Sequence, residues 1–200
     1  MIQKIKIAVL ISGSGSNLQA LIDACASPDF PAEIVTVISN RPDAYGLERA
    51  QKASIPAHLV DHKDYSDRAA FDAALLETLN PYDVDLVCLA GFMRVLTPVF
   101  IDAFEGRILN THPALLPRHG GKGMYGQHVH KAVLAAGDPV SGVSIHSVIA
   151  AVDQGPVILQ REVGVEPDDT PETLAARVLA QEHIAYPQAV KMIAEKMLNS

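Results

Sequence analysis

An asparagine and a histidine lie one residue apart at the end of an apolar stretch, in the segment ILNTHPALLP at 108–117. Residues i and i+2 of an extended chain point to the same face. Pro113 disfavours the helical conformation for the residue before it, so His112 is expected to be extended. The Asn110 amide and the His112 imidazole are therefore predicted to face the same point, although a strand-end asparagine and a packed histidine would also fit.

A carboxylate that can act with them occurs at Asp153, just before the Gly-Pro turn of AAVDQGPVILQ at 150–160. A carboxylate holds an imidazole in its charged form, and an imidazolium and an amide stabilise a developing oxyanion. The histidine can also move a proton. Such a set suits transfer of an acyl group to an amine without a covalent intermediate, whereas the alternative for Asp153 is a simple turn residue.

A glycine-rich turn, Ser12-Gly-Ser-Gly-Ser-Asn17, follows the first apolar run and opens a predicted helix. Glycines allow close backbone approach, and a helix N-terminus favours an anion. Leu18 stands where a dinucleotide fingerprint needs a third small residue, and no Gly-Lys-Ser/Thr follows. A single phosphomonoester is the ligand that fits best. An NADP-dependent reductase is an alternative, because Arg41 could bind a 2′-phosphate. A turn that binds no ligand is the further alternative.

Metal and thiol chemistry are less well supported by the pattern. His128 and His130, with His112 or His146, could supply metal ligands, but no HExxH or Cys/His zinc spacing occurs. Both His128 and His130 are expected in or beside a glycine-rich loop. The two cysteines, Cys25 and Cys88, lie in apolar segments and are interpreted as small buried side chains in a reducing compartment. No metal is therefore expected.

Short apolar runs alternate with helical patterns and must position these side chains. Strands are predicted at 6–11, 33–39, 57–60, 84–90 and 107–110, and helices at 17–26, 45–53, 66–79 and 97–104. This order predicts an α/β fold: a single doubly wound, mostly parallel sheet with helices on both faces. Strands at 142–148 and 157–165 are expected to add an antiparallel C-terminal extension. Thr170 and Pro171 begin a last helix that runs to about Leu198, and residues 1–200 are expected to form one domain.

Composition limits the partners of this 200-residue chain. Its formal net charge is −7, and charged residues make up 20% of it. No basic block tracks a phosphate backbone, so no nucleic acid is expected as a partner. Apolar runs such as 7–11 are too short to cross a bilayer. A cytoplasmic protein with small-molecule substrates and no membrane contact is expected.

Five motifs in this order resemble the phosphoribosylglycinamide formyltransferase family, the folate-dependent transformylases of purine synthesis. The motifs are SGSGSNLQA (12–20), AGFMRVL (90–96), NTHPALLP (110–117), SGVSIH (141–146) and VDQGPVILQ (152–160). The resemblance runs from about Lys6 to Met197. The later motifs are shared with methionyl-tRNA formyltransferase and formyltetrahydrofolate hydrolase, whereas the early SGSGSN is particular to the first family.

The resemblance implies an enzyme that moves a formyl group from 10-formyltetrahydrofolate to glycinamide ribonucleotide, and it implies roles for matching residues. Asn110, His112 and Asp153 match the catalytic trio, with His112 as general acid. Residues that match the substrate's phosphate and sugar contacts are Gly15, Ser16, Asn17 and Glu182. Residues that match the folate side are Arg68, Met93, Arg94, Val95, Leu96, Asn110, Ile149, Ala150, Ala151, Val152 and Asp153.

Other functions remain open at this point. A methionyl-tRNA formyltransferase would carry an added RNA-binding domain, a formyltetrahydrofolate hydrolase would lack the phosphate loop, and a non-catalytic phosphosugar-binding module would leave the trio without purpose. The segment RHGGKGMYGQHVH at 118–130 departs from the shortest versions of its loop. Its tip need not make fixed contacts, and either a monomer or a homodimer is compatible with the sequence.

Overall fold

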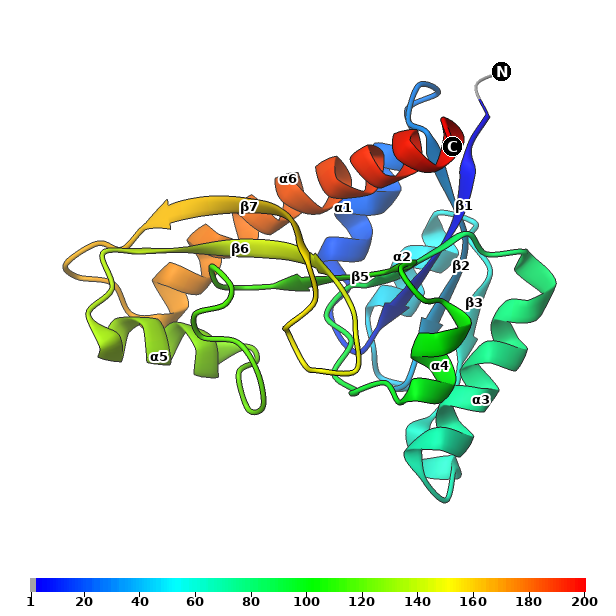
Figure 1. Ribbon diagram of the computed structural model, residues 1–200, viewed down its shortest axis with the longest axis horizontal. Coiled ribbons are helices and arrows are strands. Elements are labelled where there is room, and N and C mark those ends of the chain that lie inside the picture. The colour runs from blue at the N-terminus through cyan, green and yellow to red at the C-terminus, as the bar shows by residue number, and fades with distance from the viewer. Residues whose placement is uncertain (1–2) are drawn as a thin grey trace.

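Seven strands and six α-helices make up the part of the chain that this computed structural model describes, residues 3–200 (Figure 1). The strands are β1 (Ile5–Ile11), β2 (Ala32–Ser39), β3 (Ala57–Leu59), β4 (Leu86–Leu89), β5 (Ile108–His112), β6 (Val140–Ser147) and β7 (Val157–Gly164). The helices are α1 (Ser16–Cys25), α2 (Gly46–Lys52), α3 (Arg68–Leu79), α4 (Pro98–Ala103), α5 (Gln127–Ala136) and α6 (Pro171–Leu198). Short 3₁₀ turns lie at His62–Asp64 and Asn80–Tyr82.

All seven strands form one sheet in the order β3-β2-β1-β4-β5-β6-β7. Strands β1 to β5 are parallel, and β6 and β7 join antiparallel at one edge. In Figure 1 the β6–β7 pair extends away from the parallel part, with α6 running along it. The predicted α/β class, with its antiparallel C-terminal extension, is confirmed.

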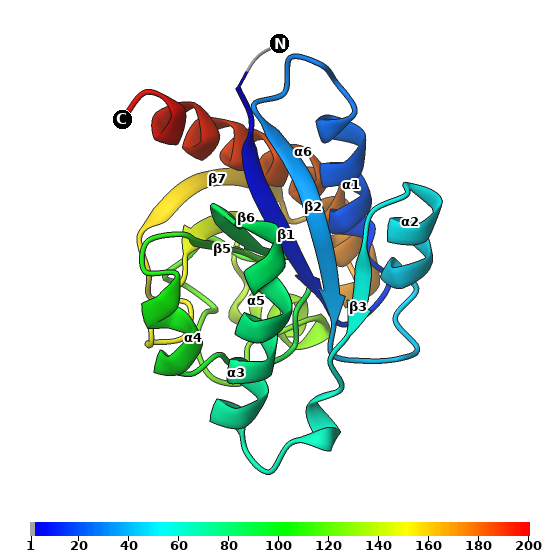
Figure 2. The same ribbon diagram turned by 90° about the vertical axis from the view of Figure 1, so that its right-hand side faces the viewer.

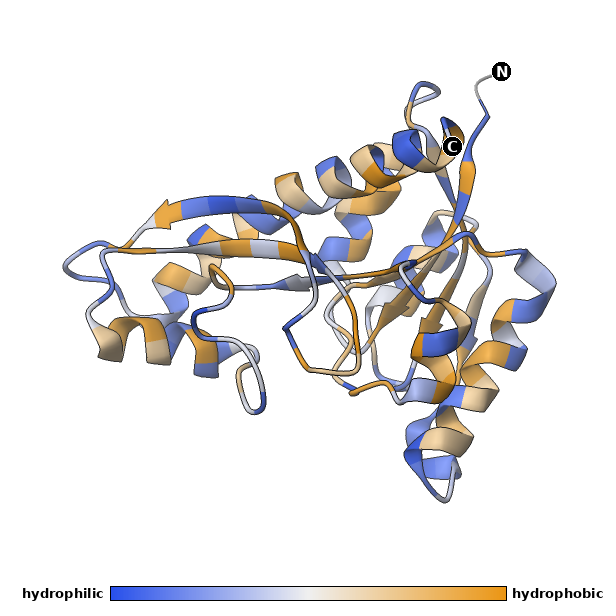
Figure 3. Cartoon of the chain, in the orientation of Figure 1, coloured by the Kyte–Doolittle hydropathy of each residue, from blue (hydrophilic) through white to orange (hydrophobic). Residues whose placement is uncertain are grey.

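Apolar side chains on both faces of the parallel strands bury them between helices. Along β1, Ile7, Val9 and Ile11 pack toward α1, α2 and α6, while Ala8 and Leu10 pack toward α3 and α4. Figure 2 shows α1 and α2 on one side of β1 and β2, and α3 and α4 on the other. Hydrophobic residues alternate with polar ones around α6 (Figure 3), as expected for a helix with one buried face.

Helix α5 is the element that the sequence pattern did not predict. The segment 118–130 is expected to be a glycine-rich loop, but its last residues belong to a helix of ten residues, Gln127–Ala136. Gly126 precedes it with no side-chain cap, and Gly137 ends it in the left-handed conformation at φ 67°. His128 and His130 lie beside the glycine-rich segment, on α5, and His130 is buried.

The carboxyl ends of β1, β4 and β5 meet at one edge of the sheet. The 12–17 turn follows β1, the 90–96 segment follows β4, and β5 runs two residues further than predicted, so that it includes His112. Ligands of doubly wound sheets bind at this edge. Among the described residues, no helix combines the length and the apolar character needed to span a membrane.

Candidate active site

Strand β5 presents two polar side chains to the same side of the sheet. Asn110 pairs with Leu89 of β4 and with His146 of β6, whereas His112 pairs with Ser144 of β6. The side chains of Asn110 and His112 both line one pocket, as the alternation of an extended chain predicted. Across the strand pair, the Asn110 amide nitrogen lies 3.1 Å from His146 Nε2.

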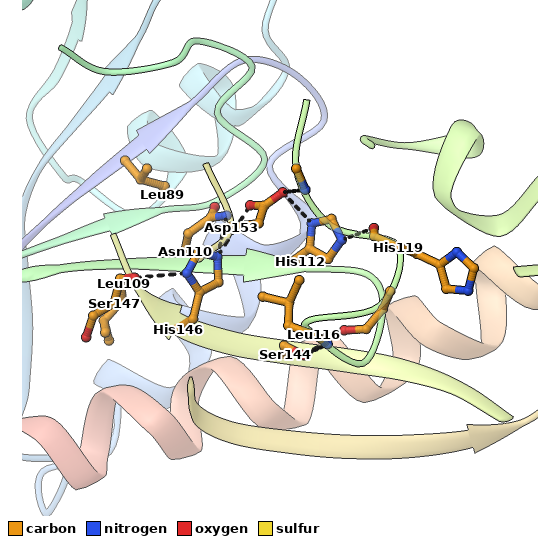
Figure 4. A network of polar contacts seen from close by, with 12 residues as sticks. Leu89, Leu109, Asn110, His112, Leu116, His119, Ser144, His146, Ser147 and Asp153 are labelled. Carbon is orange, nitrogen blue, oxygen red and sulfur yellow. Dashed lines mark hydrogen bonds and ion pairs between the residues drawn. The ribbon is translucent and has the colours of Figure 1, made fainter. Parts of the chain in front are cut away.

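Asp153 lies between the two histidines (Figure 4). Its Oδ2 is 3.5 Å from His112 Nδ1, and its Oδ1 is 3.6 Å from His146 Nε2. The same Oδ2 accepts a hydrogen bond from the Gly121 N–H at 3.0 Å. The backbone of Asp153 is left-handed, with φ 56°, a conformation that Asp and Asn adopt more readily than most residues. The structure thus brings Asn110, His112 and Asp153 together.

The hydrogen-bond partners fix which ring nitrogens carry protons. His146 Nδ1 lies 2.9 Å from the Ser147 carbonyl oxygen, so Nδ1–H donates there and Nε2 is left to accept from Asn110. Burial lowers the pKa of His146, which agrees with a neutral ring. His112 Nε2 lies 2.8 Å from the His119 carbonyl oxygen and must donate to it, while Nδ1 faces the carboxylate. Both ring nitrogens of His112 therefore face hydrogen-bond acceptors.

The site can therefore stabilise negative charge on a ligand oxygen. The neutral His146 accepts one hydrogen of the Asn110 amide and orients it, leaving the other amide hydrogen free to donate. An imidazolium at His112 adds a positive charge that the Asp153 carboxylate holds in place. Donors that are positioned in advance are what an oxyanion of acyl transfer requires.

These groups face a pocket of about 640 Å³. Of the residues that the sequence assigned to a site, those lining it are Asn17, Met93, Arg94, Val95, Leu96, Asn110, His112, Ile149, Ala150, Val152, Asp153 and Glu182. Four others, Gly15, Ser16, Arg68 and Ala151, are not in its lining. Gly121 to Gly126 also line the pocket, so the segment that was assigned no contacts forms part of its wall.

One end of the pocket carries a buried carboxylate. Glu182 of α6 accepts a hydrogen bond from the Asn17 amide at 2.6 Å, and both residues are buried. Burial raises the pKa of Glu182, partly offset by the Asn17 and Thr111 side chains. Asn17 lies in the first turn of α1, whose N-terminal amides favour an anion. A buried carboxylate, an amide and the N-terminus of α1 therefore lie together at this end of the pocket.

Gly15 has a structural reason to be glycine. Its φ is 69°, and a Cβ placed on it would lie 2.6 Å from the Gly46 Cα. The 12–17 turn thus packs directly against the start of α2. By contrast, a Cβ on Gly13 would meet nothing within 4 Å.

The 12–17 turn is tied to the 90–96 segment by a buried hydroxyl. Ser12 Oγ accepts from the Met93 N–H at 2.8 Å and donates to the Asn40 side-chain oxygen at 2.6 Å. The two walls of the pocket, one at each of these segments, are therefore held at a fixed separation.

Arg68 lies outside the pocket but close to this second wall. It is the exposed first residue of α3, and Asp72, one turn later, accepts from both the N–H and the hydroxyl of Thr97 at 2.6 and 2.7 Å. Arg68 lies near enough to lower the pKa of Asp72, although burial has the larger effect and raises it.

Three contributors were not assigned a role from the sequence: the side chains of His146 and Ser12 and the carbonyl group of His119. The SGVSIH motif contained His146, but only the β5–β6 register shows that it faces Asn110. Burial raises the pKa of the Cys88 thiol, which leaves it protonated in the core. Across residues 3–200, no group of three or more His, Cys, Asp or Glu side chains is arranged to hold a metal ion.

The chain is similar to known proteins over most of its length. Residues 5–190 match the formyl transferase family. The chain is 44% identical to the phosphoribosylglycinamide formyltransferase of Escherichia coli (strain K12), over 96% of this chain and 88% of that protein. It is 47% identical to the trifunctional purine biosynthetic protein adenosine-3 of Gallus gallus over 96% of its own length, but it spans only 18% of that relative.

Solved structures agree in fold. The glycinamide ribonucleotide transformylase 1 of Symbiobacterium toebii superposes with a TM-score of 0.92 at 49% identity, covering 96% of this chain and 89% of that one. The phosphoribosylglycinamide formyltransferase of Brucella melitensis gives 0.89 at 43% identity, covering 96% of each chain. The chain belongs to the formyl transferase family.

Proposed function

We propose that this protein transfers the formyl group of 10-formyltetrahydrofolate to the amine of glycinamide ribonucleotide, a step of purine biosynthesis. The observation that carries the proposal is one pocket that joins the Asn110–His112–Asp153 cluster to the Asn17–Glu182 pair at the N-terminus of α1. The names of the relatives support the same reaction. The free thiols of Cys25 and Cys88 fit a reducing compartment, for which we propose the cytoplasm.

The two substrates would enter from opposite ends of the pocket. The nucleotide would place its phosphate at the 15–17 turn, where helix N–H groups attract an anion, and its sugar hydroxyls toward Glu182. The folate would lie against the 93–96 segment and the 149–153 segment, whose backbone and apolar side chains line the other end. Its formyl group would then reach Asn110 and His112.

The reaction would proceed by direct attack. The amine nitrogen of the nucleotide forms a bond to the formyl carbon, and the carbonyl electron pair moves to oxygen. The Asn110 amide and the His112 imidazolium stabilise that oxyanion. The added amine loses a proton to solvent water, N10 of the folate gains one from the His112 imidazolium, and the carbon–N10 bond breaks as the carbonyl re-forms. His112 then regains its proton from solvent, so the enzyme returns to its starting state. Tetrahydrofolate and the formylated nucleotide leave, with no covalent enzyme intermediate.

The test is a transfer assay with purified protein, 10-formyltetrahydrofolate and glycinamide ribonucleotide, followed spectroscopically by loss of the formylfolate. We expect loss of formylfolate only when the nucleotide is present, and formation of one formylated nucleotide for each folate consumed. His112→Ala is the matched control for contaminating activity. Loss of formylfolate without any amine would instead indicate a hydrolase, transfer only to methionyl-tRNA would indicate that enzyme, and binding without turnover would indicate a phosphosugar-binding module.

A further inference from the structure

The hydrogen-bond partner of His112 Nε2 is a main-chain carbonyl oxygen rather than a side chain. His112 Nε2 donates to the His119 carbonyl at 2.8 Å, and the His112 side chain is only 4% exposed. Figure 4 shows this carbonyl directed at the His112 ring while the His119 side chain extends away from it. The direction in which Nδ1 points into the site therefore depends on where residue 119 places its carbonyl group.

The backbone at residue 119 adopts a conformation that needs support. His119 has φ 52°, in the left-handed region that is uncommon for residues other than glycine, although histidine, asparagine and aspartate adopt it more often than the rest. Two residues later, the Gly121 N–H donates to Asp153. The short segment 119–121 thus contacts both members of the His112–Asp153 pair, one through a carbonyl and the other through an N–H.

One buried carboxylate anchors this segment. Asp138 Oδ2 lies 2.6 Å from His119 Nε2, and Asp138 Oδ1 pairs with the Arg118 guanidinium. The Asp138 side chain is 9% exposed and follows Gly137 at the end of α5, where its N–H bonds the Val133 carbonyl. The His119 hydrogen bond and the neighbouring positive charges lower the pKa of Asp138, so its carboxylate stays ionised until the pH falls through that lowered value.

We propose that Asp138 is a positioning residue for His112. It holds His119 and Arg118 together, which fixes the left-handed backbone at 119 and aims its carbonyl group at His112 Nε2. Asp138 itself lines no part of the pocket and touches no reacting atom. The proposal rests on the formyl transfer proposed above. In it, α5 holds the Asp138 carboxylate, which follows its C-terminus, in contact with residues 118 and 119.

A purely structural role is the alternative to be distinguished. If the Asp138 ion pairs only tie α5 to the preceding loop, their loss would lower the melting temperature and leave the folded enzyme fully active. A positioning role instead predicts loss of turnover in protein that remains folded, because displacement of a catalytic group by about 1 Å costs roughly 10²-fold in rate.

The test uses Asp138→Asn, which keeps the shape and removes the charge. We expect kcat to fall about 10- to 100-fold, with KM for both substrates within about threefold, and Asp138→Glu to recover part of the loss. The matched control is Asp169→Asn, which removes a carboxylate paired with Arg177 at 2.7 Å and accepting from the Glu166 N–H, away from the pocket. It should lower the melting temperature without changing kcat.

His119→Asn supplies an independent route that does not depend on the folding of the Asp138 variant. Asparagine accepts a left-handed backbone but is too short to reach Asp138, so this variant should lose a similar factor in kcat. The double variant should lose no more than either single one, because both changes break the same contact. Additive losses, or a kcat within twofold of wild type in both single variants, would overturn the proposal.

A structural readout separates failure of this inference from failure of the proposed function. Nitrogen-15 NMR of the His112 ring reports whether Nε2 remains a hydrogen-bond donor, whatever the substrate. We expect its signal to move in Asp138→Asn and to stay in Asp169→Asn. An unmoved signal overturns the positioning role even in an active enzyme, while a moved signal in a protein that transfers no formyl group would fault only the assigned reaction.

Discussion

Replacing Asp153 by asparagine would remove one charge from the site and little else. The Gly121 N–H donates to Oδ2 at 3.0 Å, so the amide oxygen of the variant would remain on that side. Its NH₂ group would then take the place of Oδ1, 3.6 Å from His146 Nε2. Asparagine also tolerates the left-handed φ of 56° at this position. Fold and contacts should therefore survive.

The charge that is lost stands 3.5 Å from His112 Nδ1. With an effective dielectric constant of roughly 20, its attraction for an imidazolium is about 5 kcal/mol. Since about 1.4 kcal/mol corresponds to tenfold, this attraction sets an upper limit of about 10³ on the rate that the charge can contribute. We expect kcat at pH 7.5 to fall by roughly 10² to 10³, with KM for both substrates little changed because the contacts remain.

Steady-state formyl transfer measured between pH 6 and pH 8.5 checks this reasoning. Activity of Asp153→Asn should stay low although its fold and its contact with the Gly121 N–H remain. A variant with wild-type kcat and an unchanged pH profile would show that Asp153 only closes a turn.

Three further changes test other parts of the site. Asn110→Ala should lower kcat by about 10² to 10³ with little change in KM, since its amide acts on charge that develops in the transition state. A variant kcat equal to that of the wild type in steady-state kinetics would rule out this role for Asn110. Gly15→Ala should destabilise the fold by about 1–3 kcal/mol because its Cβ would press on Gly46, while Gly13→Ala should be tolerated; urea unfolding compares them. Glu182→Gln should raise the melting temperature at pH 8, because burial raises the pKa of Glu182 and thus disfavours its ionised form in the folded state; the gain should vanish as the pH falls below the carboxyl's ordinary range, where both states are protonated, and KM for the nucleotide should rise. A variant less stable at pH 8 than at pH 5, relative to wild type, would contradict it.

Much of this site was accessible from local patterns. The spacing of Asn110 and His112 required only that the segment be extended, and the structure confirms it as β5. The strand–helix alternation was strong enough to predict the parallel sheet, and Thr170 with Pro171 marked the start of α6, where a capping box is present. These features depend on residues close together in the chain.

What could not be predicted depends on contacts between distant segments or on the backbone. His146 meets Asn110 because of the antiparallel register across a connection of 27 residues, which no local pattern sets. The His119 carbonyl acts through a group that every residue has, so its residue type gives no signal. Helix α5 lacks a capping side chain and follows a glycine-rich segment, and its apolar face becomes evident only when it packs against α6.

Because β5 lies inside the sheet, the residues of the site become ordered when the chain folds rather than when substrate binds. The strand pairs with β4 as far as Asn110 and with β6 as far as His112, so strand pairing holds the backbone beneath both side chains once the chain folds. The conformational entropy of these residues is then lost during folding, and it does not reduce the free energy of substrate binding. Insertions and shifts are excluded from such a strand, because a slip of one residue would turn both side chains away from the pocket. Adaptation to a different amine or folate is therefore left to residues 122–126, 148–150 and 152, which line the pocket without hydrogen-bonding to the His112 ring.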